Sequence, residues 1–184
     1  IDNRAIYIEE RWKISDSWQL NSGLRFDDHN RYGNELTPKL ALNKKVNDYS
    51  NVYLSWGKVF NARTVDQLYY VDGIISGMPS GNPNLNPEKG DVWTLGANTK
   101  LSDNTDLSAS IYYSEIDDAI DAPGWIQYIN VNKEKRRGLE ISLNHDFDEH
   151  FSGYASYSYM QIKQNMGSGF QRESQEKPNT YRAG

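Results

Sequence analysis

The sequence predicts an all-β protein, an antiparallel up-and-down meander that forms part of a large transmembrane β-barrel. Three observations support this fold class. Apolar and polar residues alternate over segments of about ten residues, as expected for strands with one apolar face. Short and long connections follow one another along the chain. No stretch approaches the roughly 18 apolar residues that a membrane-spanning helix needs.

Alternation identifies the strands in order along the chain. The pattern is clear in residues 18–28, where Trp18, Leu20, Leu24 and Phe26 share one face and polar residues occupy the other. Three later segments repeat it, with apolar faces formed by Trp93, Leu95, Ala97 and Leu101, by Leu107, Ala109, Ile111 and Tyr113, and by Leu139, Ile141, Leu143 and Phe147. The expected strands span residues 5–14, 18–28, 38–46, 51–60, 90–101, 105–116, 136–147 and 151–162, and a ninth begins near Tyr181.

The connections between these strands alternate in length. Short turns rich in Asp, Asn and Ser are expected at residues 15–17, 47–50, 102–104 and 148–150. Longer segments separate them at residues 29–37, 61–89, 117–135 and 163–180. Because antiparallel strands send alternate connections to opposite ends, one end of the sheet should carry tight turns and the other long loops. This asymmetry is typical of outer-membrane barrels.

Composition narrows the function classes. The 13 Tyr, 5 Trp and 5 Phe favour strands and could form interfacial girdles. The absence of cysteine excludes disulfides and thiolate metal sites, and the net charge of −5 gives no reason to expect nucleic acid as a partner. No catalytic motif is present, so an enzyme is not predicted. A soluble β-sandwich binding module would explain the alternation but not strands long enough to cross a bilayer.

Three stretches carry a family resemblance. The first is the pair of strands at residues 37–42 and 52–64, the second is the Gly-Asn-Pro box at residues 81–89, and the third is the run at residues 130–140. Together they resemble TonB-dependent outer-membrane receptors of the siderophore, haem and cobalamin type. The residues that match the family pattern are Phe60, Ala62, Thr64, Asn82, Pro83, Asn84, Leu85, Pro87, Glu88, Gly138 and Glu140.

The resemblance implies a plugged barrel of about 22 strands in the bacterial outer membrane. Residues 1–184 would then be a partial barrel domain of about eight strands and the start of a ninth, with the plug domain absent from this chain. The implied partners are outer-membrane lipid and lipopolysaccharide, a small-molecule chelate, and the TonB energising complex, which would act through that plug domain. No cofactor or resident metal is implied, because the iron chelate is the cargo.

A ferric siderophore is the expected cargo, with haem and cobalamin as alternatives. Haem receptors that resemble this chain carry a histidine between the two boxes, but no histidine lies between Phe60 and Asn82. This chain also has Asn61 and Arg63 where the family usually has Arg and Pro. A passive porin or adhesin barrel would share the strands but not the box at residues 81–89.

The resemblance and the loop composition together suggest candidate site residues. Segments 61–89 and 117–135 are expected to form part of a ligand vestibule, in which Pro shapes the turns and Glu88 could cap backbone donors. The ligand candidates are Arg63, Tyr69, Tyr70, Trp125 and Tyr128, although the aromatic residues could equally anchor the loops to one another.

Charged residues near the loops have two interpretations. Lys133, Lys135, Arg136 and Arg137 could bind lipopolysaccharide phosphates or attract an anionic chelate, or they could be an ordinary solvated rim. The carboxylates of Asp117, Asp118 and Asp121 could hold calcium, but their spacing favours solvated loop charges and no metal site is predicted.

Overall fold

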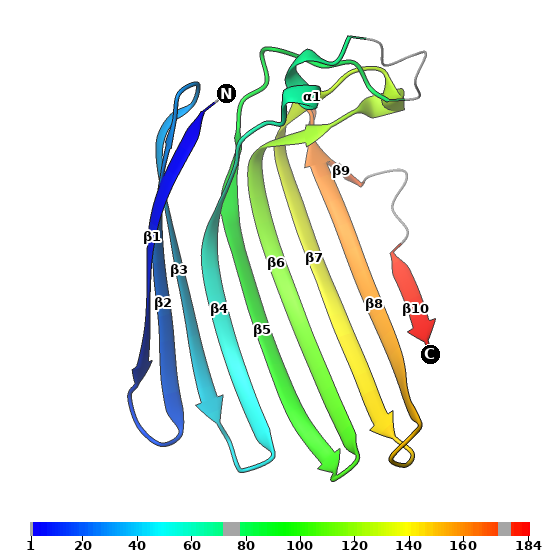
Figure 1. The fold of residues 1–184 in the computed structure, drawn as a ribbon. Helices are drawn as coiled ribbons and strands as arrows, with labels where there is room; N and C mark the ends of the chain where they lie inside the picture. The colour runs from blue at the N-terminus through cyan, green and yellow to red at the C-terminus, as the bar shows by residue number, and fades with distance from the viewer. Residues whose placement is uncertain (1, 72–77, 173–177) are drawn as a thin grey trace.

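One antiparallel sheet follows the chain through the computed structural model, which describes residues 2–71, 78–172 and 178–184. Neighbouring strands follow the order β1-β2-β3-β4-β5-β6-β7-β8-β10, and β9 pairs with β8 beyond this path (Figure 1). The strands are β1 Asn3–Lys13, β2 Trp18–His29, β3 Gly33–Lys45, β4 Ser50–Asn61, β5 Glu88–Ser102, β6 Thr105–Asp121, β7 Ile129–Asp146, β8 Ser152–Asn165, β9 Phe170–Arg172 and β10 Asn179–Ala183. Two short helices, α1 Val65–Tyr69 and the 3-10 turn η1 Pro123–Trp125, lie in the loops.

The predicted all-β meander is confirmed, but three of its segments need correction. β3 begins at Gly33, so the expected loop 29–37 shrinks to a turn at residues 30–32. β6 and β7 extend to Asp121 and from Ile129, so most of the expected loop 117–135 is a longer hairpin. The short strand β9 lies within the expected loop 163–180, and residues 72–77 and 173–177 lie outside the described residues.

The two faces of the sheet differ in polarity. The register places Leu54, Leu95, Ile111 and Leu139 in one row on neighbouring strands, and Val52, Ala97, Ala109 and Ile141 in the next row of the same face. On this outer face Leu54 is 46% exposed and Ile111 is 52% exposed. Within the described residues no second sheet packs against these side chains, which removes the β-sandwich alternative.

The described helices are too short and not apolar enough to cross a membrane.

The opposite, inner face is polar and closely packed against itself in places. Tyr53 and Tyr112 lie over glycines of the neighbouring strands. A Cβ atom added to Gly96 would meet the Tyr53 ring at 2.4 Å, and one added to Gly138 would meet the Tyr112 ring at 2.5 Å. These glycines therefore make room for tyrosine rings that lie along the inner wall, and this gives Gly138 of the family pattern a packing role.

One end of the sheet carries only tight turns, as predicted. Side chains within the turns accept backbone hydrogen bonds over two or three residues. Asn47 Oδ1 accepts from the Tyr49 amide at 2.8 Å, and Asp148 Oδ1 accepts from the His150 and Phe151 amides at 2.7 and 3.0 Å. Each turn is thus stabilised by its own residues.

Candidate functional site

The loops at the other end fold over the sheet and contact one another. We call residues 61–71, 78–88 and 118–130 the mouth cluster (Figure 1). Its small apolar core contains Leu68, Leu85, Ala119 and Val131, the last of which lies just below the cluster on β7; each is at most 2% exposed. A compact core of this kind gives loops a defined shape that solvated segments lack.

The β6–β7 hairpin bends where Asp118 adopts a left-handed backbone conformation, with φ of 53°. This residue type tolerates that region better than most. Beyond the bend, the hairpin tip pairs with the segment that precedes the Asn-Pro box. The Ser80 amide donates to Ile126 O at 2.9 Å, and the Tyr128 amide donates to Ser80 O at 3.0 Å. Ser80, just before the box, therefore forms an isolated parallel bridge with Gln127 of the hairpin tip.

Asn130 joins the hairpin to the box through backbone atoms. Its Oδ1 accepts from the Asn86 amide at 2.8 Å, and its Nδ2 donates to Asn86 O at 3.1 Å and to Asp118 O at 2.7 Å. Asn82 makes a similar link, with Nδ2 donating to Tyr128 O at 3.0 Å. Side-chain amides thus satisfy backbone groups that the irregular loops would otherwise leave unpaired.

Arg63 and Glu88 form the ionic centre of the cluster. The Arg63 side chain is fully buried, its Nε donates to Asn86 O at 2.7 Å, and its Nη1 lies 3.5 Å from Glu88 Oε2. Burial lowers the pKa of the Arg63 guanidinium from its usual value, and the Glu88 carboxylate opposes this shift. Glu88 also accepts from the Ile120 amide at 2.8 Å and from Asn61 Nδ2 at 2.7 Å, so it caps a backbone donor as predicted.

Helix α1 begins at a capping box. Thr64 Oγ1 accepts from the Gln67 amide, and the Gln67 side chain accepts from the Thr64 amide, each at 3.2 Å. The end of α1 lies against the box, because the Gly81 amide donates to Tyr70 O at 2.6 Å. A Cβ atom at position 81 would meet the Tyr69 and Tyr70 nitrogens at 2.6 Å, so this close approach requires glycine.

The β2–β3 turn also reaches the cluster, which sequence reasoning missed. Arg31 donates to Pro83 O and to the Tyr69 hydroxyl, and the Tyr32 hydroxyl donates to Leu85 O at 3.4 Å. His29 lies beneath, 3% exposed, and accepts from the Arg31 amide at 3.1 Å. Nothing in the local pattern of residues 29–32 signals contacts with segments more than 50 positions away.

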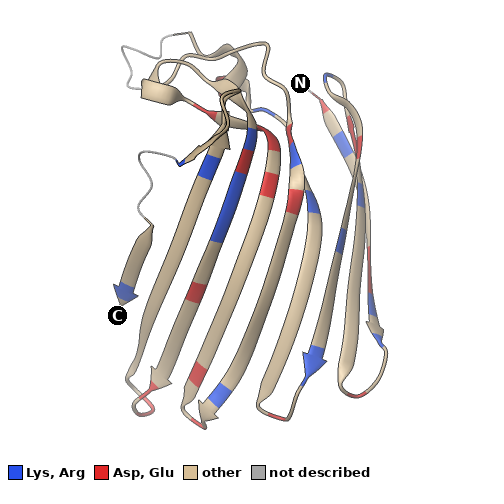
Figure 2. Cartoon of the chain, turned by 180° about the vertical axis from the view of Figure 1, so that it is seen from behind, with Lys and Arg blue, Asp and Glu red and all other residues tan. Residues whose placement is uncertain are grey.

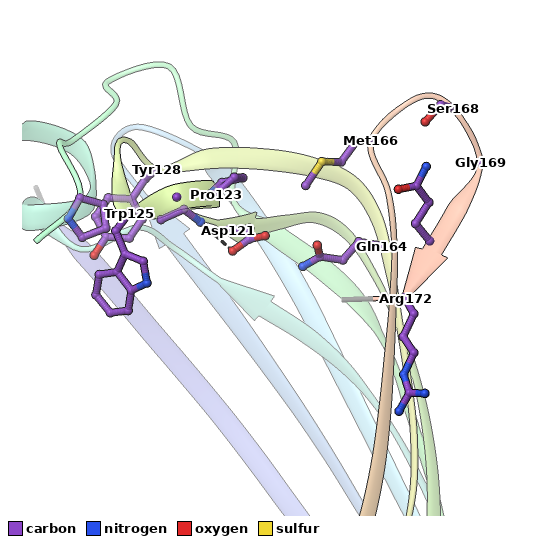
Figure 3. A pocket seen from close by; sticks show the side chains of 13 residues that line it. Asp121, Pro123, Trp125, Tyr128, Gln164, Met166, Ser168, Gly169 and Arg172 are labelled. Atoms are coloured by element: carbon purple, nitrogen blue, oxygen red, sulfur yellow. Dashed lines mark hydrogen bonds between the residues drawn. The ribbon is translucent and has the colours of Figure 1, made fainter. Parts of the chain in front are cut away.

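A pocket of about 550 Å³ opens between the hairpin tip and the β8–β9 connection (Figure 3). Trp125 and Tyr128 line one side, and Gln164, Met166 and Arg172 line the other. Gln164 Nε2 donates to the buried Glu134 carboxylate at 2.9 Å, and Arg136 also pairs with this carboxylate. The pocket therefore combines aromatic rings, a thioether and polar groups, and its volume lies within the usual range for small-molecule sites.

The structure separates the predicted ligand residues into three groups. Trp125 and Tyr128 line the pocket, Tyr69 and Tyr70 lie at the end of α1 near Arg31, and Arg63 is buried beneath the box. The Arg63 side chain has no exposed surface to offer a ligand, because Asn86 and Glu88 enclose it, so its position fits a structural role better than the predicted contact.

The residues that match the family pattern lie in two regions of the structure. Phe60, Ala62, Thr64, Asn82, Pro83, Asn84, Leu85, Pro87 and Glu88 lie in or beside the mouth cluster. Gly138 and Glu140 lie lower on the inner wall of β7, where Glu140 lines a second, shallow pocket of about 360 Å³. Among the described residues, no group of three or more His, Cys, Asp or Glu side chains could hold a metal ion.

Comparisons with known proteins agree with this geometry. Residues 1–183 match the model of the family described as TonB dependent receptor-like, beta-barrel. The vitamin B12 transporter BtuB of Photobacterium profundum is 32% identical over 181 residues, which cover 88% of this chain and 26% of that protein. The probable TonB-dependent siderophore receptor PirA of Acinetobacter baumannii is 32% identical over 96 residues, 46% of this chain and 13% of that protein.

Among solved structures, the siderophore receptor PirA of Pseudomonas aeruginosa superposes with a TM-score of 0.71 and 23% identity. The match covers 98% of this chain and 36% of that one. This chain spans about a quarter of the BtuB relative and a smaller share of the Acinetobacter protein.

Proposed function

Because this chain belongs to the TonB-dependent receptor-like β-barrel family, whose members are bacterial outer-membrane transporters and receptors rather than enzymes, we propose that it forms one wall and part of the outer vestibule of a ferric siderophore importer. The observation that carries the proposal is the pocket beside the mouth cluster. It lies at the end of the sheet that carries the long loops, which in outer-membrane barrels is the extracellular end.

The pocket chemistry suits a flat, partly apolar chelate with polar oxygen atoms. Trp125 is 61% exposed at the pocket edge and can stack on an aromatic arm of the ligand. Gln171, opposite Gln164 on the other side, provides an amide donor for the oxygen atoms of such a chelate. Glu134 lies near this region, but Arg136 and Gln164 occupy its carboxylate and so limit its repulsion of an anion.

The mouth cluster would hold this pocket in shape. Trp125 and Tyr128 lie on the hairpin tip, which the Ser80 and Asn82 contacts connect to the box. Preorganised side chains lose less freedom when a ligand binds, and this preserves affinity for a dilute nutrient. Release of the ligand from the vestibule would require the TonB complex to act on a plug domain of the whole receptor. The residues described here contribute only the barrel wall to that step.

A cobalamin importer is the second candidate, because the B12 transporter match covers more of this chain than the siderophore receptor match does. Equilibrium binding to the full-length receptor in detergent separates the two. We expect binding of ferric catecholate siderophores and no binding of cyanocobalamin at the same concentrations. The reverse result would transfer the proposal to cobalamin, and binding of neither ligand class would reject both.

The contribution of the pocket is tested with Trp125→Ala. We expect a rise in Kd for the ferric siderophore of about twofold to tenfold, since an aromatic contact is worth about 0.5–1.5 kcal/mol. Trp12→Ala is the matched control, because Trp12 lies on the outer face near the tight turns and is similarly exposed. Equal affinities of the Trp125 variant and the unmodified receptor would show that the ligand binds elsewhere.

A further inference from the structure

The antiparallel ladder between β3 and β4 covers only the half of these strands that is nearer the tight turns. Its last pair is Lys39 with Gly57, although β3 extends back to Gly33 and β4 extends on to Asn61. Among the described strands, this is the one interface at which both neighbours continue beyond the last pair. We call residues 33–38 and 58–61 the seam. Figure 1 shows β3 and β4 apart towards the loop end, and Figure 2 shows this gap from behind.

Both edges of the seam begin with a residue that opposes strand pairing. Pro38 is the first residue of β3 beyond the last pair, and it has no N–H group to donate. Lys58 is the first residue of β4 beyond that pair, and it is exposed. Proline and lysine are the residues with which natural proteins commonly protect open strand edges. The residues at the base of the seam therefore keep the two strands apart.

The seam begins just above an aromatic row on the outer face, which contains Trp56, Trp93 and Tyr113. Aromatic girdles mark the boundary between hydrocarbon and lipid headgroups. Open strand edges do not occur inside the hydrocarbon, because unpaired backbone groups there would lack water. The height of the seam meets this condition, so water can satisfy its free N–H and C=O groups.

The basic residues predicted for the rim lie on both faces at about this height. Lys133, Lys135 and Arg137 share the outer face, whereas Arg136 points to the inner face and pairs with Glu134.

Two hollows meet at the seam. They have volumes of about 490 and 380 Å³, and Arg25, Thr37 and Lys58 line both of them. The larger hollow extends to Asn61 and Ala62, where the mouth cluster begins. Polar side chains and free backbone groups thus line a continuous route from the seam to the vestibule.

One ion pair spans the seam. Lys89 on β5 reaches across β4 to Glu35 on β3, and its Nζ lies 5.7 Å from the centre of the Phe60 ring. Above the seam, Arg31 donates to Pro83 O and joins the β2–β3 turn to the box. The seam is therefore bounded at both ends and crossed by a side-chain bar.

We propose that the seam is a side opening in the barrel wall, through which water and small hydrophilic solutes pass between the cell surface and the vestibule without crossing the mouth cluster. Water displaced by a chelate at the mouth can leave by this route. The Lys89–Glu35 pair bars the opening to larger molecules. The inference uses the position of the barrel in the outer membrane and does not depend on which chelate is imported.

Cysteine pairs in the full-length receptor test whether the strands are apart. T37C/V59C would place two thiols directly opposite each other if the register continued, and the matched control A41C/S55C places them at a directly opposite pair of the ladder below. A disulfide requires Cα atoms about 4.4–6.8 Å apart. After mild oxidation in outer-membrane vesicles, we expect a disulfide in the control and none in T37C/V59C, which only a longer bifunctional thiol reagent should link. Disulfide formation at the same rate in both would overturn the proposal.

Labelling of T37C alone tests passage through the seam. The reagent is fluorescein maleimide, added to vesicles from the outside. We expect E35Q to raise the labelling rate by about twofold to fivefold, because an exposed ion pair is worth up to about 1 kcal/mol. The matched control is E9Q, since Glu9 also pairs with a lysine two strands away, Lys39, but across fully paired strands.

S168C, in the pocket beside the mouth cluster, reports on the mouth and should be labelled at the same rate with and without E35Q. Failure of small membrane-impermeant thiol reagents to label T37C would overturn the proposal. So would equal effects of E35Q and E9Q, or a parallel rise at S168C, since E35Q would then have widened the mouth instead. If T37C/V59C does not assemble, the single-cysteine series decides by itself.

Discussion

The two ends of the sheet are stabilised in different ways. At the tight-turn end, Asn47 and Asp148 bond to amides two or three residues away. In the mouth cluster, Asn130 bonds to a residue 44 positions away, and Glu88 bonds to one 32 positions away. A change in a turn should therefore remain local, whereas a change in the mouth cluster should loosen several loops together. The barrel wall lies between the two ends and should be little affected by either change.

The largest effect is expected from Arg63→Ala. Removing one partner of a buried ion pair costs about 3–5 kcal/mol, because the remaining charge and the emptied space are not compensated. We expect the opening free energy of the Ile120 amide, which donates to Glu88, to fall by about 3 kcal/mol in hydrogen-exchange measurements on the full-length receptor.

Arg63→Met is the control for packing, since it keeps most of the side-chain volume but removes the charge. Its loss should be smaller than that of Arg63→Ala, and the difference between them measures the packing contribution. Unchanged exchange at Ile120 in both variants would contradict the view that Arg63 organises the cluster.

A smaller effect is expected from Asn130→Ala, which removes three hydrogen bonds to backbone groups of Asn86 and Asp118. At about 1 kcal/mol for each bond, the exchange protection of the Asn86 amide should fall by about 2–3 kcal/mol. Asn130→Asp keeps the acceptor for that amide but loses both donors, so it should retain part of the protection. If Asn130→Asp and Asn130→Ala reduced the protection of the Asn86 amide equally, the hydrogen bonds that Asn130 donates to the two carbonyl groups would account for the whole effect.

The smallest effect is expected from Asp148→Ala in a tight turn. Loss of its two local hydrogen bonds should cost about 1 kcal/mol at the Phe151 amide. Exchange at Ile120 and Asn86 should remain unchanged, because no described contact joins this turn to the mouth cluster. Any measurable loosening of the mouth cluster would mean that the two ends are coupled through the wall.

The wall could be predicted from sequence because one physical rule governs it. Leu107, Ala109, Ile111 and Tyr113 alternate with polar residues, and this alternation is sufficient to place β6. The rule fails where the outer face becomes charged. Lys133 and Lys135 continue the outer face of β7 above the aromatic row, but their charge hides the alternation, so the strand was predicted to begin seven residues late.

The mouth cluster was predicted only in part. Family resemblance selected the box at residues 81–89 and the run at Asn130, because these residues recur as recognisable motifs. It could not reveal that Arg63 is buried, since burial depends on three segments that meet only in the folded chain. Arg31 and Tyr32 were missed for the same reason, because their partners Pro83 and Leu85 are more than 50 positions away.

The three hydrogen bonds of the Asn130 side chain have a consequence for sequence variation among receptors of this kind. Each of its hydrogen bonds ends on a main-chain nitrogen or oxygen, never on a neighbouring side chain. The side chain at position 86 can therefore change while the loop keeps its course, whereas position 118 needs a residue that tolerates a left-handed backbone. A scaffold held in this way can acquire new cargo preferences by surface substitution, without having to evolve a new architecture for its entrance.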